Sequence, residues 1–142
     1  MDYSDVVLRL GAAVLAGAII GVDREIRGKP AGLRTVSLVT LGAAMLVVLG
    51  EGLNAGSSNA TSSVIQGIVT GIGFLGAGTI IRGRDEGSVR GLTTAASIWL
   101  AAATGVACGL GEWPVVFVAI GFGLLILLLD PLEEWLKARV AR

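Results

Sequence analysis

The chain has 142 residues and no net charge, 54% of its residues are apolar, and its mean hydropathy is +0.81. This composition excludes an ordinary soluble domain and indicates an integral membrane protein. The absence of histidine excludes imidazole-based catalysis and histidine-ligated metal sites, and the single cysteine, Cys108, excludes an internal disulfide.

Successive apolar stretches predict an all-α fold with five transmembrane helices in a single domain, residues 1–142. The stretches are Val6–Val22, Thr35–Leu49, Val64–Ile81, Leu92–Leu110 and Val115–Leu129. Most are slightly short for a hydrocarbon core of about 30 Å, so we expect the helices to extend into the flanking residues.

The basic residues are segregated among the gaps between these stretches. All except Arg9 lie in the first gap, the third gap and the C-terminal tail: Arg24, Arg27, Lys29, Arg34, Arg82, Arg84, Arg90, Lys137, Arg139 and Arg142. Short basic loops stay in the cytoplasm. We therefore predict a multi-pass membrane protein, with its N-terminus outside and its C-terminus inside.

Glycines recur in pairs four residues apart inside the stretches. The pairs are Gly17 with Gly21, Gly67 with Gly71, and Gly105 with Gly109. This spacing places both glycines on one helix face, where another backbone can approach closely. We expect tight helix packing within or between protomers. We also predict a homo-oligomer, most simply a dimer, that packs through the Gly17/Gly21 face or the Gly105/Gly109 face.

The chain also matches itself at an offset of 59 residues. At that offset, Gly32-Leu33-Arg34-Thr35 aligns with Gly91-Leu92-Thr93-Thr94. The match predicts two similar helix–loop–helix hairpins in the same orientation, as in a parallel duplication. Chance matching of glycine- and alanine-rich helices is the alternative.

The third stretch contains an unusual run of glycines from Gly71 through Gly73 to Gly78. Glycine weakens a helix by about 1 kcal/mol relative to alanine. A discontinuous helix whose carbonyls coordinate an ion is one interpretation. A helix against which other helices pack very closely is the other interpretation, and we favour it.

The C-terminal tail predicts a short amphipathic helix at the membrane interface, over about residues 131–141. Asp130, Pro131 and Glu133 form the pattern of a capping box at its start. Leu132, Trp135, Leu136 and Val140 then share one face.

The two basic loops are the densest clusters of functional candidates, because each leads into a helix N-terminus that can attract an anion. Candidates for binding an anionic lipid or a partner are Arg24, Arg34, Thr35, Arg82, Arg90, Thr93 and Thr94. The alternative is that the arginines are topology signals only, with Thr35 and Thr93 as helix caps. Asp23 and Glu25 are expected to pair with arginines of the other loop, and are weak candidates for Mg²⁺ ligands.

Other classes of function find little support in the sequence. No carboxylate or base lies in the middle of a stretch, where ion-coupled transporters usually place one. The sequence contains no nucleophile–base pair, P-loop or metal-ligand spacing. We therefore expect no enzymatic activity, no cofactor and no nucleic-acid partner.

Three motifs resemble the signatures of the MgtC/SapB family. They are Gly21-Val22-Asp23-Arg24-Glu25 followed by Lys29-Pro30-Ala31-Gly32-Leu33-Arg34-Thr35, the run from Thr70 to Ile81, and the run from Val89 to Trp99. The resemblance implies an inner-membrane protein linked to growth in low magnesium and, in some pathogens, to survival inside macrophages. Some members are thought to bind membrane partners, such as the ATP synthase or a P-type ATPase, without moving Mg²⁺ themselves.

The chain departs from the family pattern in two ways. Virulence-associated members continue into a soluble cytoplasmic domain, whereas this sequence stops at Arg142, and Asp23 stands where glutamate is common. We predict an accessory or regulatory membrane protein for magnesium and membrane-energy homeostasis that acts through its cytoplasmic loops. The alternative is an ion transporter or channel that uses the glycine-rich third stretch.

Overall fold

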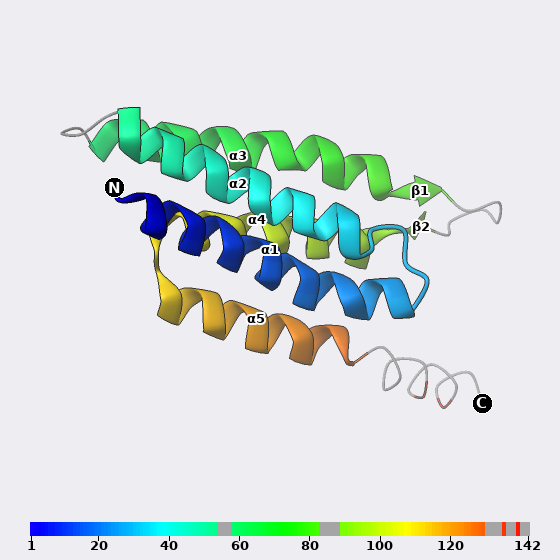
Figure 1. Cartoon of the computed structure of the whole chain (residues 1–142). Coiled ribbons are helices and arrows are strands. Elements are labelled where there is room, and N and C mark those ends of the chain that lie inside the picture. The colour runs from blue at the N-terminus through cyan, green and yellow to red at the C-terminus, as the bar shows by residue number, and fades with distance from the viewer. Residues whose placement is uncertain (54–57, 83–88, 130–134, 136–138, 140–142) are drawn as a thin grey trace.

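The computed structural model describes residues 1–53, 58–82, 89–129, 135 and 139, and these are mostly helical (Figure 1). The helices are α1 (Tyr3–Ile26), α2 (Leu33–Leu53), α3 (Ser58–Thr79), α4 (Leu92–Leu110) and α5 (Trp113–Leu127). Two-residue strands, β1 (Ile81–Arg82) and β2 (Val89–Arg90), pair antiparallel before α4, with Ile81 opposite Arg90. The prediction of five helices is confirmed.

Helices α1 to α4 are each long and apolar enough to cross a membrane. The first three extend beyond the predicted stretches at one or both ends, and α4 has the predicted bounds. Helix α5 has 15 residues, and it begins and ends two residues before the predicted stretch. Two points stay predictions: α5 spans the bilayer, and the N-terminus is outside. The helix packing is the same in either orientation, so it does not test the second point.

Local sequence explains where two of these helices end. Gly28, just after α1, has φ +61°, and Gly111, just after α4, has φ +75°. Only glycine adopts this left-handed conformation without strain, so each residue lets the chain leave its helix sharply. Pro114 then lies in the first turn of α5, where a missing N–H is tolerated.

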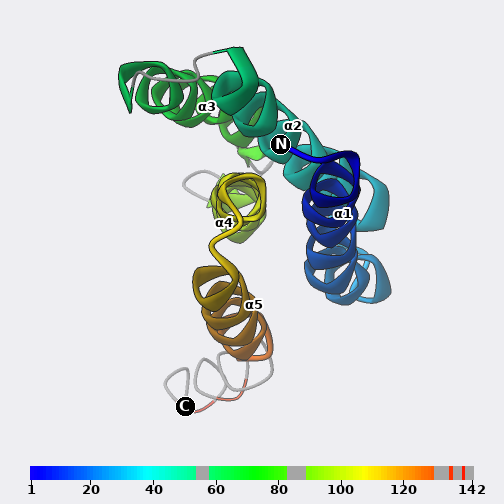
Figure 2. The ribbon, with the colours of Figure 1, turned by 60° about the vertical axis from the view of Figure 1, so that its left-hand side comes forward.

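Helix α4 is the centre of the fold and packs against all four other helices. Helices α1, α2 and α3 form a curved layer, α4 lies against the inner side of that layer, and α5 lies beyond α4 (Figure 2). Many of the core residues are small, including Ala13, Ala16, Ala44, Ala101 and Ala107. Small side chains let these helices approach closely, as membrane helices must when no hydrophobic force drives them together.

A junction of three helices forms around Thr40 of α2, whose side chain is fully buried. Gly17 of α1 lies against it from one side, where an added Cβ would collide with Thr40 Oγ1 and lie 2.7 Å from Ser37 Cα. Gly105 of α4 lies against Thr40 from the other side, where an added Cβ would lie 2.9 Å from Thr40 Cα. The Thr40 hydroxyl donates to the carbonyl of Ser37 at 2.9 Å, so this buried hydroxyl is satisfied within its own helix.

Gly21 and Gly109 also pack against α2. A Cβ at Gly21 would lie 2.8 Å from Leu33 Cα, and one at Gly109 would lie 2.8 Å from the carbonyl oxygen of Ala44. The Gly17/Gly21 and Gly105/Gly109 faces are therefore used inside the protomer. The sequence predicted that one of these two faces forms the contact between protomers, and neither face is free to do so.

Helix α3 is one continuous helix, so the interpretation of the third stretch as a discontinuous helix is wrong. The expected close packing of its glycine run is also absent within the protomer. A Cβ at Gly67, Gly71 or Gly73 would meet nothing within 4 Å, whereas one at Gly76 would contact Ala95 Cβ at 3.7 Å.

Two further sequence predictions remain untested. The duplication stays a prediction, although Gly17 and its counterpart Gly76 both lie against the helix that follows them. The interfacial helix at residues 131–141 falls largely outside the described residues. Of its residues, Trp135 and Arg139 are helical, and the guanidinium carbon of Arg139 lies 4.4 Å from the centre of the Trp135 ring.

Candidate functional site

A buried arginine connects α1 to α4 at the end of the bundle that carries the basic loops. Arg24 lies in the last turn of α1 with only 1% of its surface exposed, and its Nη2 donates to Thr94 Oγ1 at 2.5 Å. Thr94 lies in the first turn of α4 and is also buried. A buried guanidinium must have hydrogen-bond acceptors. The Arg24–Thr94 contact therefore holds the end of α1 in a set position against the start of α4.

Asp23 is paired within its own helix. Its Oδ1 accepts from Arg27 Nε at 2.8 Å, one helical turn further along α1. Its Oδ2 is buried and has no hydrogen-bond partner among the described residues. Residues four apart on a helix are neighbours, which explains this local pair. The predicted pairing of Asp23 with an arginine of the other loop stays a prediction, because the side chain of Arg82 lies outside the described residues.

Glu25 caps the helix that follows it. Its Oε2 accepts from the backbone N–H of Leu33, the first residue of α2, at 3.0 Å. A side chain at Gly32 would collide with this carboxylate, so the glycine makes room for it. The positive end of the α2 dipole is thus occupied by a carboxylate of the chain itself. Glu25 is accordingly engaged with α2 and not with Arg90.

Helix α4 begins differently. Its N-cap is Gly91, with φ +91°, which has no side chain that could accept from the first N–H groups. Thr35 and Thr93 are exposed and lie inside their helices, so the alternative role of these two threonines as N-caps is wrong.

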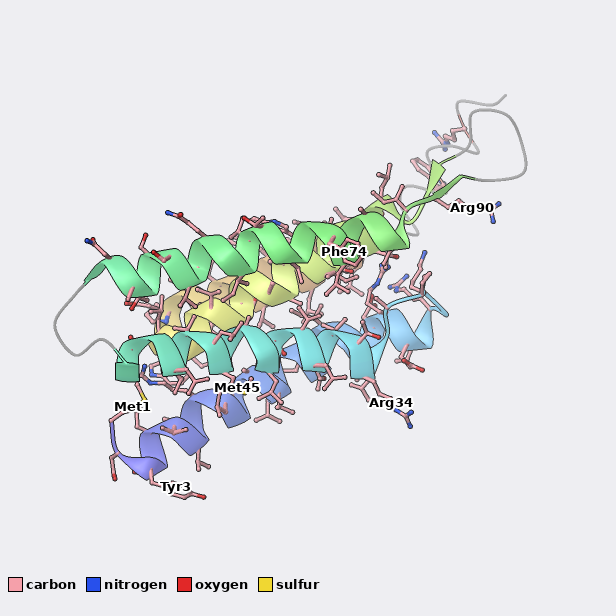
Figure 3. The ribbon with its side chains drawn as sticks, turned by 90° about the horizontal axis from the view of Figure 1, so that it is seen from above. Met1, Tyr3, Arg34, Met45, Phe74 and Arg90 are labelled. Carbon is pink, nitrogen blue, oxygen red and sulfur yellow. The ribbon has the colours of Figure 1, made fainter. Side chains whose placement is uncertain are left out.

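Two of the candidate arginines face outward. Arg34 and Arg90 lie at the same end of the bundle, are exposed, and extend away from it (Figure 3). Neither forms an ion pair with another described residue. The backbone of Arg82 pairs with Val89 in the short ladder, and its side chain lies outside the described residues.

The structure offers no support for a metal site at Asp23 and Glu25. Across the described ranges, no group of three histidine, cysteine, aspartate or glutamate side chains is close enough to hold a metal ion. The two carboxylates are instead engaged with Arg27 and with the N-terminus of α2.

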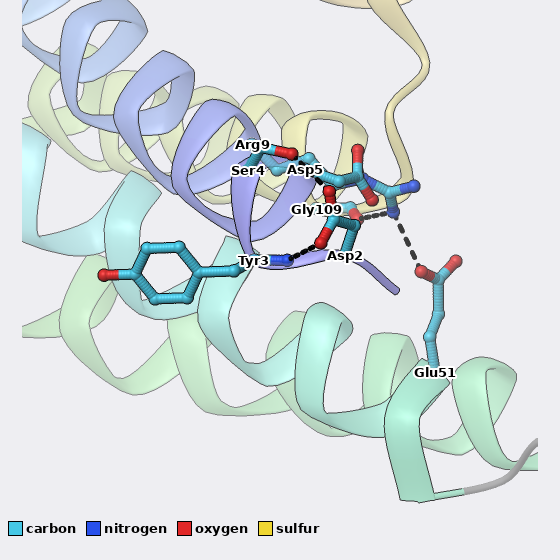
Figure 4. A network of polar contacts seen from close by, with 7 residues as sticks. All are labelled: Asp2, Tyr3, Ser4, Asp5, Arg9, Glu51 and Gly109. Atoms are coloured by element: carbon cyan, nitrogen blue, oxygen red, sulfur yellow. Dashed lines mark hydrogen bonds and ion pairs between the residues drawn. The ribbon is translucent and has the colours of Figure 1, made fainter.

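A second polar cluster lies at the opposite end of the bundle and was missed from the sequence (Figure 4). Arg9 Nε contacts Asp5 at 3.1 Å, and Arg9 Nη1 donates both to Glu51 Oε2 at 2.8 Å and to the carbonyl of Gly109 at 2.7 Å. The guanidinium therefore joins α1, α2 and the C-terminal turn of α4, where backbone carbonyls lack helical partners. The available signal was that Arg9 is the only basic residue predicted at an end that otherwise carries acids.

Replacing Arg9 by glutamine is expected to lower the free energy of unfolding by about 2–3 kcal/mol, because two carboxylates and a helix-end carbonyl lose their shared donor. Unfolding by sodium dodecyl sulfate in mixed micelles measures this change. Arg90→Gln, at an exposed residue, is the matched control and should leave stability nearly unchanged. Equal effects of the two substitutions would show that the Arg9 cluster contributes nothing specific.

An apolar groove of about 680 Å³ lies between α2 and α3. Its lining runs from Thr35 to Leu46 on α2 and from Val64 to Leu75 on α3, with Ala102 of α4 at its base. Among the described residues that line it, only Thr35 has a polar side chain. The groove therefore provides apolar surface and almost no ligands for an ion.

A family model and several known proteins match this chain. The model of the MgtC family matches residues 10–135. Protein SrpB of Synechococcus elongatus is 41% identical over 138 residues, which cover 89% of this chain and 75% of that protein. Protein MgtC of Brucella abortus is 46% identical over 135 residues (94% of this chain, 55% of that protein). Protein MgtC of Salmonella typhimurium is 47% identical over 108 residues (75% and 44%).

The chain thus spans about half the length of these two MgtC relatives and three quarters of the length of SrpB. No solved structure matches it.

Proposed function

The chain belongs to the MgtC family, and on that premise we propose that it is an accessory or regulatory protein of the bacterial inner membrane. It acts in magnesium and membrane-energy homeostasis by binding membrane partners, among which a membrane ATPase is the first candidate. The contact surface is the end of the bundle that carries both basic loops.

This function is supported by a difference among the charged residues at that end: some are engaged in contacts within the protomer, and others are exposed. Arg24 and Glu25 link α1 to α4 and to α2, and Asp23 pairs with Arg27 at the end of α1. Arg34 and Arg90 are exposed and point away from the bundle. Two outward cations beside a membrane suit an anionic lipid headgroup or a carboxylate of a partner protein. The N-terminus of α4, next to Arg90, adds a positive dipole end to the same surface.

The alternative is a transporter, for which the groove between α2 and α3 is the specific evidence. Mg²⁺ requires oxygen ligands in near-octahedral geometry. The described lining residues provide one hydroxyl, that of Thr35, and no carboxylate. This chemistry favours the regulatory function over an ion path through the groove.

We expect the double variant Arg34→Gln/Arg90→Gln to be made in normal amounts but to recover about tenfold less of its ATPase partner from membranes. Loss of two exposed charge contacts of about 0.5–1 kcal/mol each predicts a change of that order. The measurement is quantitative co-purification, alongside complementation of growth in low magnesium. Arg34→Lys/Arg90→Lys, which retains both charges, is the control.

Two results would contradict the proposed function. The first is full complementation and full partner recovery by the glutamine variant. The second is saturable Mg²⁺ flux into liposomes that contain only the purified protein, which would establish the transporter instead.

A further inference from the structure

The outward face of α3 carries a continuous seam of polar and small residues at alternating spacings of four and three. We call these six residues the α3 seam: Asn59, Ser63, Gln66, Thr70, Gly73 and Ala77. The five spacings average 3.6 residues, so all six residues lie along one side of the helix, in the same alternation as the a and d positions of a coiled coil. All six are exposed.

The exposure of the seam is unexpected for a helix of this composition. Helices α3 and α4 are the two least apolar of the four long spans. Of the most apolar 18-residue segment of α4, 56% is buried inside the protomer, whereas the corresponding share of α3 is 6%. The α4 hydroxyls of Thr94, Ser97 and Thr104 are turned inward and buried. Helix α3 instead packs through Ile68 and Ile72 and turns its polar side away from the protein.

Helix α3 lies at the edge of the helical layer (Figure 2), and the seam residues are exposed, so in a membrane this polar side would face lipid if nothing covered it. The hydroxyls of Ser63 and Thr70 donate to carbonyls of their own helix, at 2.9 Å and 2.8 Å. The side-chain amide of Gln66 forms no hydrogen bond with the residues that the structure describes. An amide without a partner in hydrocarbon is strongly unfavourable, so the seam requires a polar surface to cover it.

We propose that the α3 seam is covered by the α3 seam of a second copy of this chain, in a symmetric dimer. Copies of one protein insert in the same orientation, so the two α3 helices run parallel about a two-fold axis along the membrane normal. Each seam residue then lies near its own counterpart. An amide is both donor and acceptor, so Gln66 can pair with the partner's Gln66.

The other residues of the seam also fit a second copy of this chain. Gly73 and Ala77 carry no side chain beyond a methyl group, so the two backbones can approach closely in that half of the interface. A single polar residue at a heptad position is the feature that selects two strands and a defined register in coiled coils. A lipid acyl chain fits poorly, because it cannot form hydrogen bonds with Gln66. The Gly17/Gly21 and Gly105/Gly109 faces are already covered by α2.

Disulfide cross-linking in native membranes tests the surface directly. Cys108 is first replaced by alanine, and single cysteines are then placed at Ser63 or Thr70, which leaves Gln66 intact. Oxidation should convert most of either variant into covalent dimers. Phe122→Cys, on the exposed face of α5, is the control and should give little dimer. Absence of cross-links at both seam positions, or equal cross-linking at Phe122, would overturn the proposal.

Native mass spectrometry from lipid nanodiscs tests the number of copies and the role of the amide. The wild-type protein should be a dimer, and Gln66→Leu should raise the dissociation constant of that dimer at least about tenfold. Val69→Leu, at an exposed neighbour on α3, should leave it unchanged. A wild-type monomer, a larger assembly, a complex with a different protein at α3, or an unchanged dimer in Gln66→Leu would each overturn the proposal.

Discussion

Replacing Gly105 by alanine is expected to lower the free energy of unfolding by about 2–3 kcal/mol. The new Cβ would collide with the carbonyl oxygen of Thr40 and lie 2.9 Å from both Thr40 Cα and Ala43 Cβ. Backbone atoms of a packed helix cannot rotate away, so α4 must move off α2, and overpacking of this kind typically has that cost. The effect is large because α4 is the helix that packs against all the others.

Gly71→Ala provides the matched control, because it is the same substitution in a helix where the new Cβ meets nothing within 4 Å. Alanine is the better helix former by about 1 kcal/mol, so this variant should be as stable as the wild type or more stable. Both are measured by unfolding in mixed micelles. The two alanine variants should therefore shift stability in opposite directions. A Gly105→Ala variant as stable as Gly71→Ala would show that α2 and α4 are further apart than described.

Replacing Arg24 by alanine is expected to lower the free energy of unfolding by about 3 kcal/mol or more. The substitution removes the largest fully buried side chain among the described residues, leaves a cavity between α1 and α4, and deprives Thr94 of its donor. Arg34→Ala, at an exposed residue of α2, should change stability by less than about 0.5 kcal/mol. The measurement is the same micellar unfolding, with the amount of protein in membranes as a second readout.

Two further variants separate packing from hydrogen bonding at this site. Arg24→Met keeps most of the volume, and Thr94→Val keeps the shape of the threonine without its acceptor. If the contact stabilises the fold, Thr94→Val alone should lower the free energy of unfolding by about 1–3 kcal/mol. The same substitution should lower it much less in a chain that already carries Arg24→Met. Additive effects of the two substitutions would show that Arg24 and Thr94 contribute independently.

The sequence predicted correctly those features that depend on composition along the chain. Apolar stretches placed the five helices, because a helix that crosses or is buried in a membrane must be apolar over most of its length. The three motifs identified the family, whose model matches residues 10–135. The spacing of Gly17 and Gly21 indicated a helix face that another backbone approaches, although it did not indicate which helix that would be.

The tertiary structure decided which side of each helix is inside. A helix that is apolar all round carries little amphipathic signal, so its sequence does not reveal whether a face meets protein or lipid. The pairs Gly67/Gly71 and Gly105/Gly109 have the same spacing, yet only the second pair contacts another helix. Likewise, Arg24 and Arg34 lie in the same basic segment, but the packing of α1 against α4 buries Arg24, whereas Arg34 at the start of α2 is exposed. Contacts between residues far apart in the chain, such as Arg9 with Glu51, depend on helix neighbours that no local pattern specifies.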